Sequence, residues 1–201
     1  MNAFLRIGAA LALAAAAGGC SLSSMLGGGG AAPPYLYDLT SDASSSVAPV
    51  RSGAVGESVT FQTPVIGREL RTTRVPVQVT PVVVEYVKDM TWVDMPNRLF
   101  QKLLEETVRA TTGRVVLDPS QAAVDPGLVV TGELRKFGFD AQQGMAVVEY
   151  DASLAAQGGT HVETRRFTAS LPADGTAATV GPALNQAANQ VALEVARWIG
   201  G

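Results

Sequence analysis

The sequence predicts a single α+β domain in which two amphipathic helices pack on one face of a mostly antiparallel sheet, with mixed strand pairing left open. Several segments alternate apolar and polar residues, as strands with one covered face do. Two other segments carry apolar residues at helical spacing. The last three strand-like segments are joined by turns too short for parallel crossovers. Packing two helices on one sheet face buries all of these apolar stripes.

The first half of the domain is predicted to form short strands. Residues 35–40 alternate aromatic and aliphatic side chains and predict a first strand. Residues 59–66 predict a second one, which Pro64 limits to an edge or a break. Residues 74–87 are dense in β-branched side chains and predict one or two strands divided by prolines.

Residues 88–114 contain the first predicted helix. Asp94 can cap its start, and Pro96 suits its first turn. Gly113 is a suitable stop after the last turn, and residues 115–117 then predict a strand. An apolar stripe marks the face of this helix that we expect to be buried: Leu99, Phe100, Leu103, Leu104 and Val108.

Residues 127–140, 144–159 and 160–174 predict three long strands joined by glycine-containing hairpin turns. The middle segment alternates most clearly. Glu149 and Asp151 lie on its wetter face. The covered face carries Ala146, Val148, Tyr150, Ala152, Leu154 and Ala156.

Residues 181–201 predict the closing helix. Pro182 suits its first turn, and two glycines end it. Asn185 and Asn189 lie off its apolar face. That face is formed by Leu184, Ala188, Val191, Val195 and Trp198.

Residues 1–19 predict a secretory signal peptide. Arg6 precedes an apolar run over residues 7–17, which is shorter than the roughly 20 residues of a transmembrane helix. Small residues follow this run and end at Cys20. This order resembles the bacterial lipobox, in which the cysteine thiol takes a diacylglycerol and the new N-terminus takes an acyl chain. The alternative is an ordinary signal peptide with an incidental cysteine. Because the chain contains 1 cysteine, no disulfide partner exists for it.

Residues 20–34 predict a flexible tether between this anchor and a domain over residues 35–201. The tract after Cys20 is rich in serine, glycine and proline and cannot form a core. It has 34 − 20 = 14 residues, which reach roughly 45–50 Å when fully extended.

Little catalytic chemistry is available in the sequence. Charged residues make up 16% and the net charge is −3, so no basic surplus favours nucleic acid. The chain contains 1 histidine, His161, and no cysteine or second histidine stands near it in the sequence to complete a metal site. Glu105 and Glu106 are neighbours on a helix and predict a solvated face. We therefore expect no enzymatic activity, no metal and no cofactor beyond the acyl chains on Cys20.

The order of motifs in the domain resembles the ABC-type transport auxiliary lipoproteins, the PqiC-like family. Glu85-Tyr86 ends a strand, and Trp92 and an aspartate then precede a leucine-rich helix. The segment "VTGELRKF", residues 130–137, and the final "LNQAANQVALEVARWI" complete the likeness. The resemblance implies a periplasm-facing outer-membrane lipoprotein, whose partner is an MCE-family protein of a lipid transporter driven by an ABC ATPase. Within it, only Cys20 is a functional position.

Two alternatives stay open. The domain could be a periplasmic lipoprotein that binds a lipid or another hydrophobic ligand directly, in which case an apolar cavity of several hundred Å³ is expected. It could also be an assembly lipoprotein of another envelope machine. Ser21 is compatible with export to the outer membrane, and a homo-oligomer is compatible with every alternative. The apolar Met90, Trp92 and Met95 before the first helix are either lids on the core or partner contacts.

Overall fold

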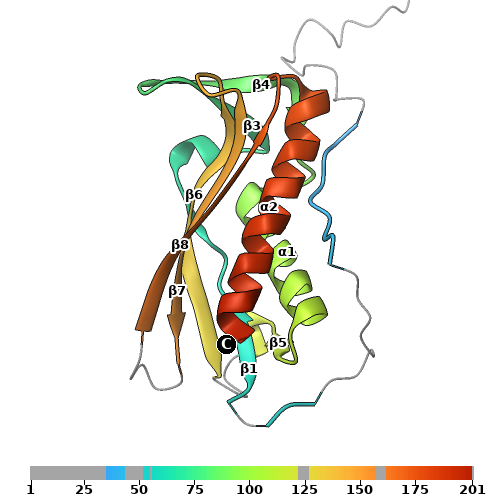
Figure 1. Ribbon diagram of the computed structural model, residues 1–201, viewed down its shortest axis with the longest axis vertical. Helices are drawn as coiled ribbons and strands as arrows, with labels where there is room; N and C mark the ends of the chain where they lie inside the picture. The colour runs from blue at the N-terminus through green and yellow to red at the C-terminus, as the bar shows by residue number, and fades with distance from the viewer. Residues whose placement is uncertain (1–34, 44–51, 55, 122–126, 157–161, 201) are drawn as a thin grey trace, which may run out of the picture. The chain divides into compact units, whose positions relative to one another are not determined.

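The computed structural model describes residues 35–43, 52–54, 56–121, 127–156 and 162–200. All of them lie in the second of two compact units, residues 35–201. Along the chain the elements are β1 (Ser58–Phe61), β2 (Val65–Ile66), η2 (Arg68–Leu70), β3 (Arg74–Thr80), β4 (Val83–Thr91), α1 (Pro96–Thr111), β5 (Val115–Leu117), η3 (Pro119–Gln121), β6 (Leu128–Asp140), β7 (Met145–Ala155), β8 (Val162–Pro172) and α2 (Ala177–Gly200). Figure 1 shows the helices together on one side of the sheet, as expected from their apolar stripes.

The sheet has 8 strands and is mixed, which corrects the expectation of a mostly antiparallel one. On one edge of β6, strands β1, β2 and β3 follow one another and pair parallel to it. On the other edge, β7 pairs antiparallel to β6, and β8 pairs antiparallel to β7. Parallel pairing requires a long crossover, and α1 supplies one because it lies between the early strands and β6.

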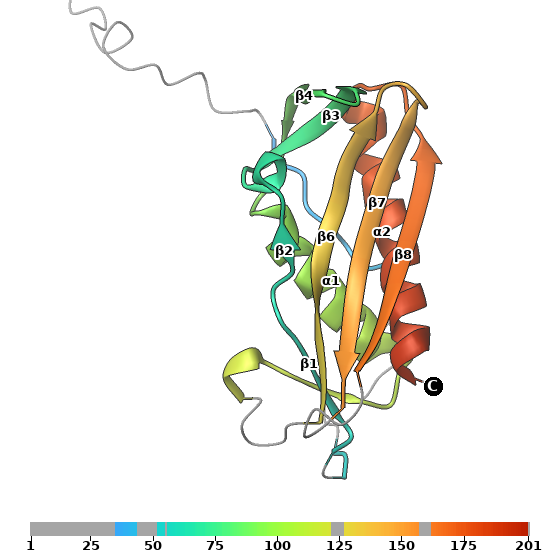
Figure 2. The ribbon, with the colours of Figure 1, turned by 90° about the vertical axis from the view of Figure 1, so that its left-hand side faces the viewer.

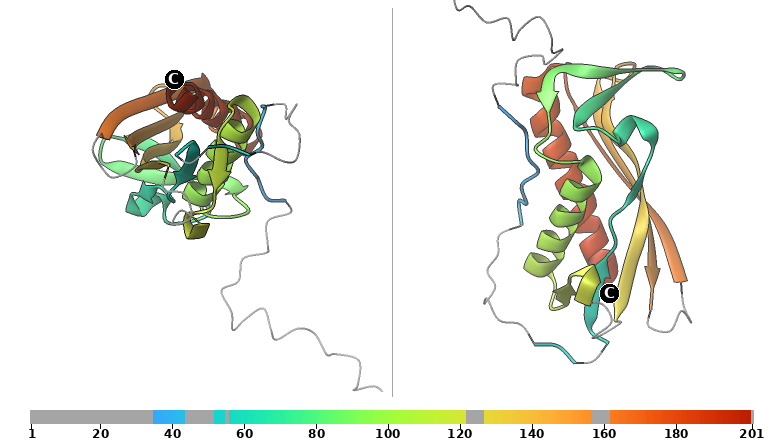
Figure 3. Two further views of the ribbon diagram at one scale, coloured as in Figure 1. Left: turned by 90° about the horizontal axis from the view of Figure 1, so that it is seen from below. Right: turned by 180° about the vertical axis from the view of Figure 1, so that it is seen from behind.

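The core fills the space between the sheet and the two helices, α1 and α2, which lie side by side (Figure 3). The predicted stripe of α1 is buried in full, and so are Leu184, Ala188, Val191 and Val195 of α2. On β7 the alternation is confirmed, since Ala146, Val148, Tyr150 and Ala152 are buried. The largest fully buried side chains are Trp92, Tyr150, Phe61, Phe100 and Phe137.

The predicted first strand over residues 35–40 does not form. Tyr37 makes one isolated bridge with Trp92, in which its N–H donates to Thr91 and its carbonyl accepts from Val93. The chain then leaves β4 and follows α2, whose side chains bond the backbone of Thr40. The second predicted strand forms as β1 and β2, separated at Pro64 as expected.

The helix ends differ partly from the expected ones. Helix α1 begins at Pro96 as expected, but its N-cap is Met95, because the Asp94 carboxylate bonds the Met95 N–H (2.7 Å) instead of a helical one. The helix ends at Thr111, shortly before Gly113.

Helix α2 begins at Ala177, so Pro182 lies inside it and not in the first turn. The earlier start has a physical cause. The Asp174 carboxylate accepts three hydrogen bonds: one from the Thr176 N–H (2.9 Å), one from the Thr176 hydroxyl and one from the Thr179 hydroxyl. These bonds satisfy polar groups at the helix start. These bonds lower the Asp174 pKa to about 2.

Candidate interaction surfaces

The site residue predicted from the sequence, Cys20, lies outside the described residues, and so does His161. The described part of the domain therefore shows where surfaces could meet partners, not the attachment site itself. Met90 and Trp92 are buried in the core, so these two act as core residues. Met95 is partly buried and packs against the same core.

A clamp on α2 holds the first described segment, residues 35–43. The Asn185 side chain accepts the Thr40 N–H (2.9 Å), and the Asn189 side chain accepts the Asp42 N–H (2.8 Å). Asn189 also donates to the Thr40 carbonyl (2.8 Å) and is only 9% exposed. The sequence places both asparagines off the apolar stripe without assigning them a partner. Two amides one helical turn apart were the available signal.

Aromatic packing continues the clamp toward the start of this segment. The Tyr37 ring meets Trp92 edge-on at 6.3 Å between centroids, and Tyr35 meets Tyr37 at 5.7 Å. Burial, with a smaller contribution from Tyr35, raises the Tyr37 pKa. The start of the described chain, at Tyr35, is therefore held beside the end of β4.

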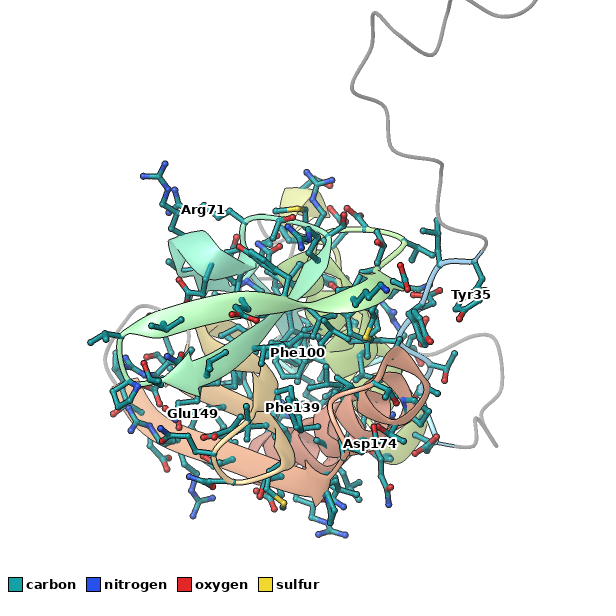
Figure 4. All side chains as sticks on the ribbon, turned by 90° about the horizontal axis from the view of Figure 1, so that it is seen from above. Tyr35, Arg71, Phe100, Phe139, Glu149 and Asp174 are labelled. Atoms are coloured by element: carbon teal, nitrogen blue, oxygen red, sulfur yellow. The ribbon has the colours of Figure 1, made fainter. Side chains whose placement is uncertain are left out.

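The β3–β4 ribbon, residues 74–91, projects across one end of the domain (Figures 1 and 4). Its tip carries exposed valines: Val82 is 91% exposed, and Val83 and Val84 are exposed beside it. Gln78 donates to the carbonyls of Thr80 and Val83, which holds the tip closed. A protruding run of aliphatic side chains on ordered backbone is typical of an interaction surface.

A large irregularity in β4 sets the direction of this ribbon. Between the pairs Arg74–Thr91 and Pro76–Tyr86, β3 contributes one residue and β4 contributes four. Asp89, in the inserted stretch, has a φ of 56°, which is rare for a residue with a side chain. The insertion allows both Val87 and Met90 to enter the core.

The base of the ribbon rests closely on β6. A Cβ at Gly138 would stand 2.4 Å from the Pro76 carbonyl oxygen, so the close approach requires glycine there. A hollow of about 90 Å³ lies beside this contact, with Leu70, Val84 and Phe139 among its walls. This hollow is far smaller than a lipid site needs.

The face of β6, β7 and β8 opposite the helices carries an ion-pair network that we name the charged sheet face: Glu133, Arg135, Lys136, Glu149, Asp151 and Arg166. Arg166 binds Asp151 through two bonds of 2.6 and 2.7 Å. The hydrogen bond from Arg166 lowers the pKa of Asp151. The same hydrogen bond raises the pKa of Arg166. A shift in strand register places Arg135 within 3.3 Å of Glu149. Opposite charges are thus paired on a wet face, as the alternation in β7 predicts.

Two further hollows open to solvent. One of about 780 Å³ lies where α1 and α2 end, between Thr111, Arg114, Arg197 and Gly200. Another, of about 450 Å³, lies between β8 and α2 and is lined by Arg165, Phe167, Arg197 and Trp198 among others. Trp198 is held there by a bond from its indole N–H to Glu163 (2.9 Å). Both open to solvent and mix polar and apolar atoms in their walls, so neither is an enclosed apolar cavity.

Among the described residues, no three histidine, cysteine or acidic side chains are grouped so that they could hold a metal ion. No helix in the same part of the chain combines the length and the apolar character needed to cross a membrane.

A sequence model for the ABC-type transport auxiliary lipoprotein component matches residues 37–196, and the chain belongs to that family. The resemblance seen in the order of its motifs is therefore confirmed. No curated protein matches the sequence.

Solved structures share the fold at low sequence identity. A crystal structure of a protein from Xanthomonas campestris is 20% identical with a TM-score of 0.65, covering 83% of this chain and 95% of that one. The crystal structure of an uncharacterized protein is 18% identical with a TM-score of 0.58, covering 72% and 94%. At these identities the likeness shows the fold alone.

Proposed function

We propose that this chain is a non-enzymatic subunit of an MCE-type lipid transporter, anchored by acyl chains on Cys20 to the outer membrane and facing the periplasm. The observation that carries the proposal is the family match over residues 37–196, joined to the lipobox-like sequence ending at Cys20. Membership of a family of auxiliary transport components supports a role in docking to the transporter and positioning it. Ser21 after the cysteine supports the outer membrane as the destination.

The filled core supports a scaffold over a direct lipid carrier. The rings of Phe100 and Tyr150 meet edge-on, with 5.2 Å between their centroids. They fill the space between sheet and helices in which a ligand would have to lie. The Tyr150 hydroxyl reaches the Thr131 carbonyl at 3.4 Å, and burial raises its pKa, so it stays a neutral phenol. A lipid could enter only by displacing these rings, which close packing opposes.

Lipid anchoring explains how such a small domain stays at the membrane. Each buried CH₂ contributes about 0.8 kcal/mol, so several acyl chains hold the protein stably where one chain does not. The tether then leaves the domain free to meet a conduit that spans the periplasm, and no catalytic group is needed for this role.

Affinity purification tests the proposal. The full-length chain, tagged at its C-terminus, is purified in mild detergent from the envelope of its own cells, and its companions are identified by mass spectrometry. We expect an MCE-family protein together with an ABC permease and ATPase. A matched preparation of Cys20→Ala should lose these companions or recover far less of them. Recovery of none of them with the native chain, under conditions that keep known envelope complexes intact, contradicts the proposal.

A further inference from the structure

We propose that the end of the domain bearing the β3–β4 ribbon rests on the bilayer that holds the acyl anchor, with Val82, Val83 and Val84 entering the boundary between headgroups and acyl chains. This inference rests on the proposed lipid attachment at Cys20 and adds an orientation to it. The protein then has two contacts with the membrane: the acyl anchor at the end of the tether, and a reversible contact through the ribbon.

The ribbon tip has the chemistry of a membrane contact. No charged residue occurs from Val75 to Val84, and the valines at its end are aliphatic, adjacent and exposed. Its backbone is paired within the ribbon, Gln78 with Val84 and Thr80 with Val83. Pairing within the ribbon satisfies the backbone groups that face between its two strands, and a contact no deeper than the headgroup boundary leaves the outer edge of β4, the last strand of the sheet, within reach of water.

The place where the tether joins the domain supports the same orientation. Tyr35 packs edge-on against Tyr37 (5.7 Å between ring centroids), and Tyr37 pairs with Trp92, which directly follows β4 of the ribbon. The Tyr37–Trp92 bridge and the asparagine clamp hold it there. Tyr35 is 57% exposed and Leu36 is exposed beside it. Tyrosine is typical of membrane–water interfaces because its ring is apolar and its hydroxyl is wet.

The length of the tether makes a weak contact sufficient. The 34 − 20 = 14 residues after Cys20 span roughly 20 Å as a flexible coil. The ribbon is thus kept close to the surface, and the contact becomes effectively intramolecular, with a high local concentration. A few valines that would not hold a free protein on a membrane can then orient a tethered one.

Other surfaces fit a bilayer less well, and a protein partner fits this tip less well. The charged sheet face would lose the hydration of Glu149, Asp151 and Arg166 on contact with lipid. Protein interfaces are enriched in aromatic side chains and arginine at their centre, and residues 79–84 contain neither. The tip also protrudes (Figure 1), whereas a hot spot usually lies in a packed pocket.

Depth measurement on the anchored full-length protein tests the orientation. Val82→Cys is labelled with an environment-sensitive fluorophore, because the acylated sulfur of Cys20 cannot react with a maleimide. The labelled protein is reconstituted in vesicles of phosphatidylethanolamine and phosphatidylglycerol that contain a nitroxide-bearing lipid. Val162→Cys is the matched control, since Val162 is 59% exposed and begins β8 at the opposite end of the sheet (Figure 2). Flotation of the vesicles reports the anchor separately.

We expect the label at position 82 to shift to the blue and to be quenched several-fold more than the label at position 162. Replacing Val83 and Val84 by serine in the same labelled protein should reduce both effects. A protein that floats with the vesicles while both labels stay equally wet overturns the orientation and leaves the anchor intact. A protein that does not float overturns the anchor and the orientation together. A blue shift that appears only after an MCE-family protein is added shows that the tip contacts protein, and this also overturns the inference.

Discussion

The ring of Tyr37 lies against the backbone of Gly181, and a Cβ at Gly181 would stand 2.6 Å from two of its carbon atoms. Glycine at this point of α2 is therefore what lets the first described segment pack on the helix. In a helix without this neighbour, replacing glycine by alanine stabilises by about 1 kcal/mol. Here we expect Gly181→Ala to destabilise the protein by about 1–3 kcal/mol, because the aromatic ring must move.

Urea denaturation of Gly181→Ala, of Tyr37→Ala and of the double variant measures how strongly the ring and the helix backbone are coupled. Tyr37→Ala should relieve the clash, so the combined variant should lose less than the sum of the single losses. Gly113→Ala is the control, since nothing lies within 4 Å of a Cβ there. Additive losses, or a stabilising Gly181→Ala, would contradict the close packing described.

Asn189→Ala should destabilise the attachment of residues 35–43 to α2. The substitution leaves the Asp42 N–H and the Thr40 carbonyl without their partner. We expect a loss of about 1–3 kcal/mol, as for other buried hydrogen-bonding groups. Hydrogen exchange at the Asp42 amide should quicken more than exchange in β7. Asn185→Ala, at an exposed bond, should have the smaller effect. An unchanged Asp42 exchange rate would show that Asn189 does not hold the segment.

Asp174 should contribute to the acid sensitivity of the fold. Its pKa of about 2 in the folded state lies below the value of about 3.9 expected when unfolded. The contribution is therefore fully present above the unfolded pKa and is lost as the pH falls from about 4 to about 2. Asp174→Asn should be less stable at neutral pH and should lose less of its stability than the native chain over that acid range. Thermal melts at a series of pH values measure both, and parallel curves would refute this role.

Arg166→Gln should raise the pKa of Asp151. The hydrogen bond and charge of Arg166 hold that pKa low in the folded protein, so its loss shifts the titration toward the ordinary value. Carboxyl chemical shifts followed by NMR between about pH 2 and 6 measure the change. Arg165→Gln is the neighbouring control, because Arg165 lies over the Phe167 ring and not beside Asp151. Equal shifts in both variants would argue against the direct pair.

The local elements follow from the sequence because burial imposes periodicity on them. The stripe of α1 and the alternation of β7 each report which face meets the core. The parallel pairing of β1, β2 and β3 with β6 has no such local signal. It depends on where a long crossover places strands that lie far apart in the chain. The expectation of a mostly antiparallel sheet was wrong for this reason.

The interaction surfaces were predicted less completely than the fold. The β-branched run before α1 predicts strands, but the irregularity in which four residues of β4 lie opposite one of β3 depends on burying both Val87 and Met90. The asparagine clamp joins residues about 145 positions apart in sequence, and only the fold brings them together. The role of Cys20 rests on the sequence alone and stays a prediction.

Lipid attachment at Cys20 is the central claim, and metabolic labelling with palmitate tests it most directly. The native chain, Cys20→Ala and a Ser21→Ala control are expressed at full length in a Gram-negative host and separated into membrane and soluble fractions. The account predicts labelled, membrane-bound protein for the native chain and for the control. It predicts a folded, unlabelled protein that leaves the membrane fraction for Cys20→Ala. A Cys20→Ala protein that still takes up palmitate and still fractionates with membranes would contradict it.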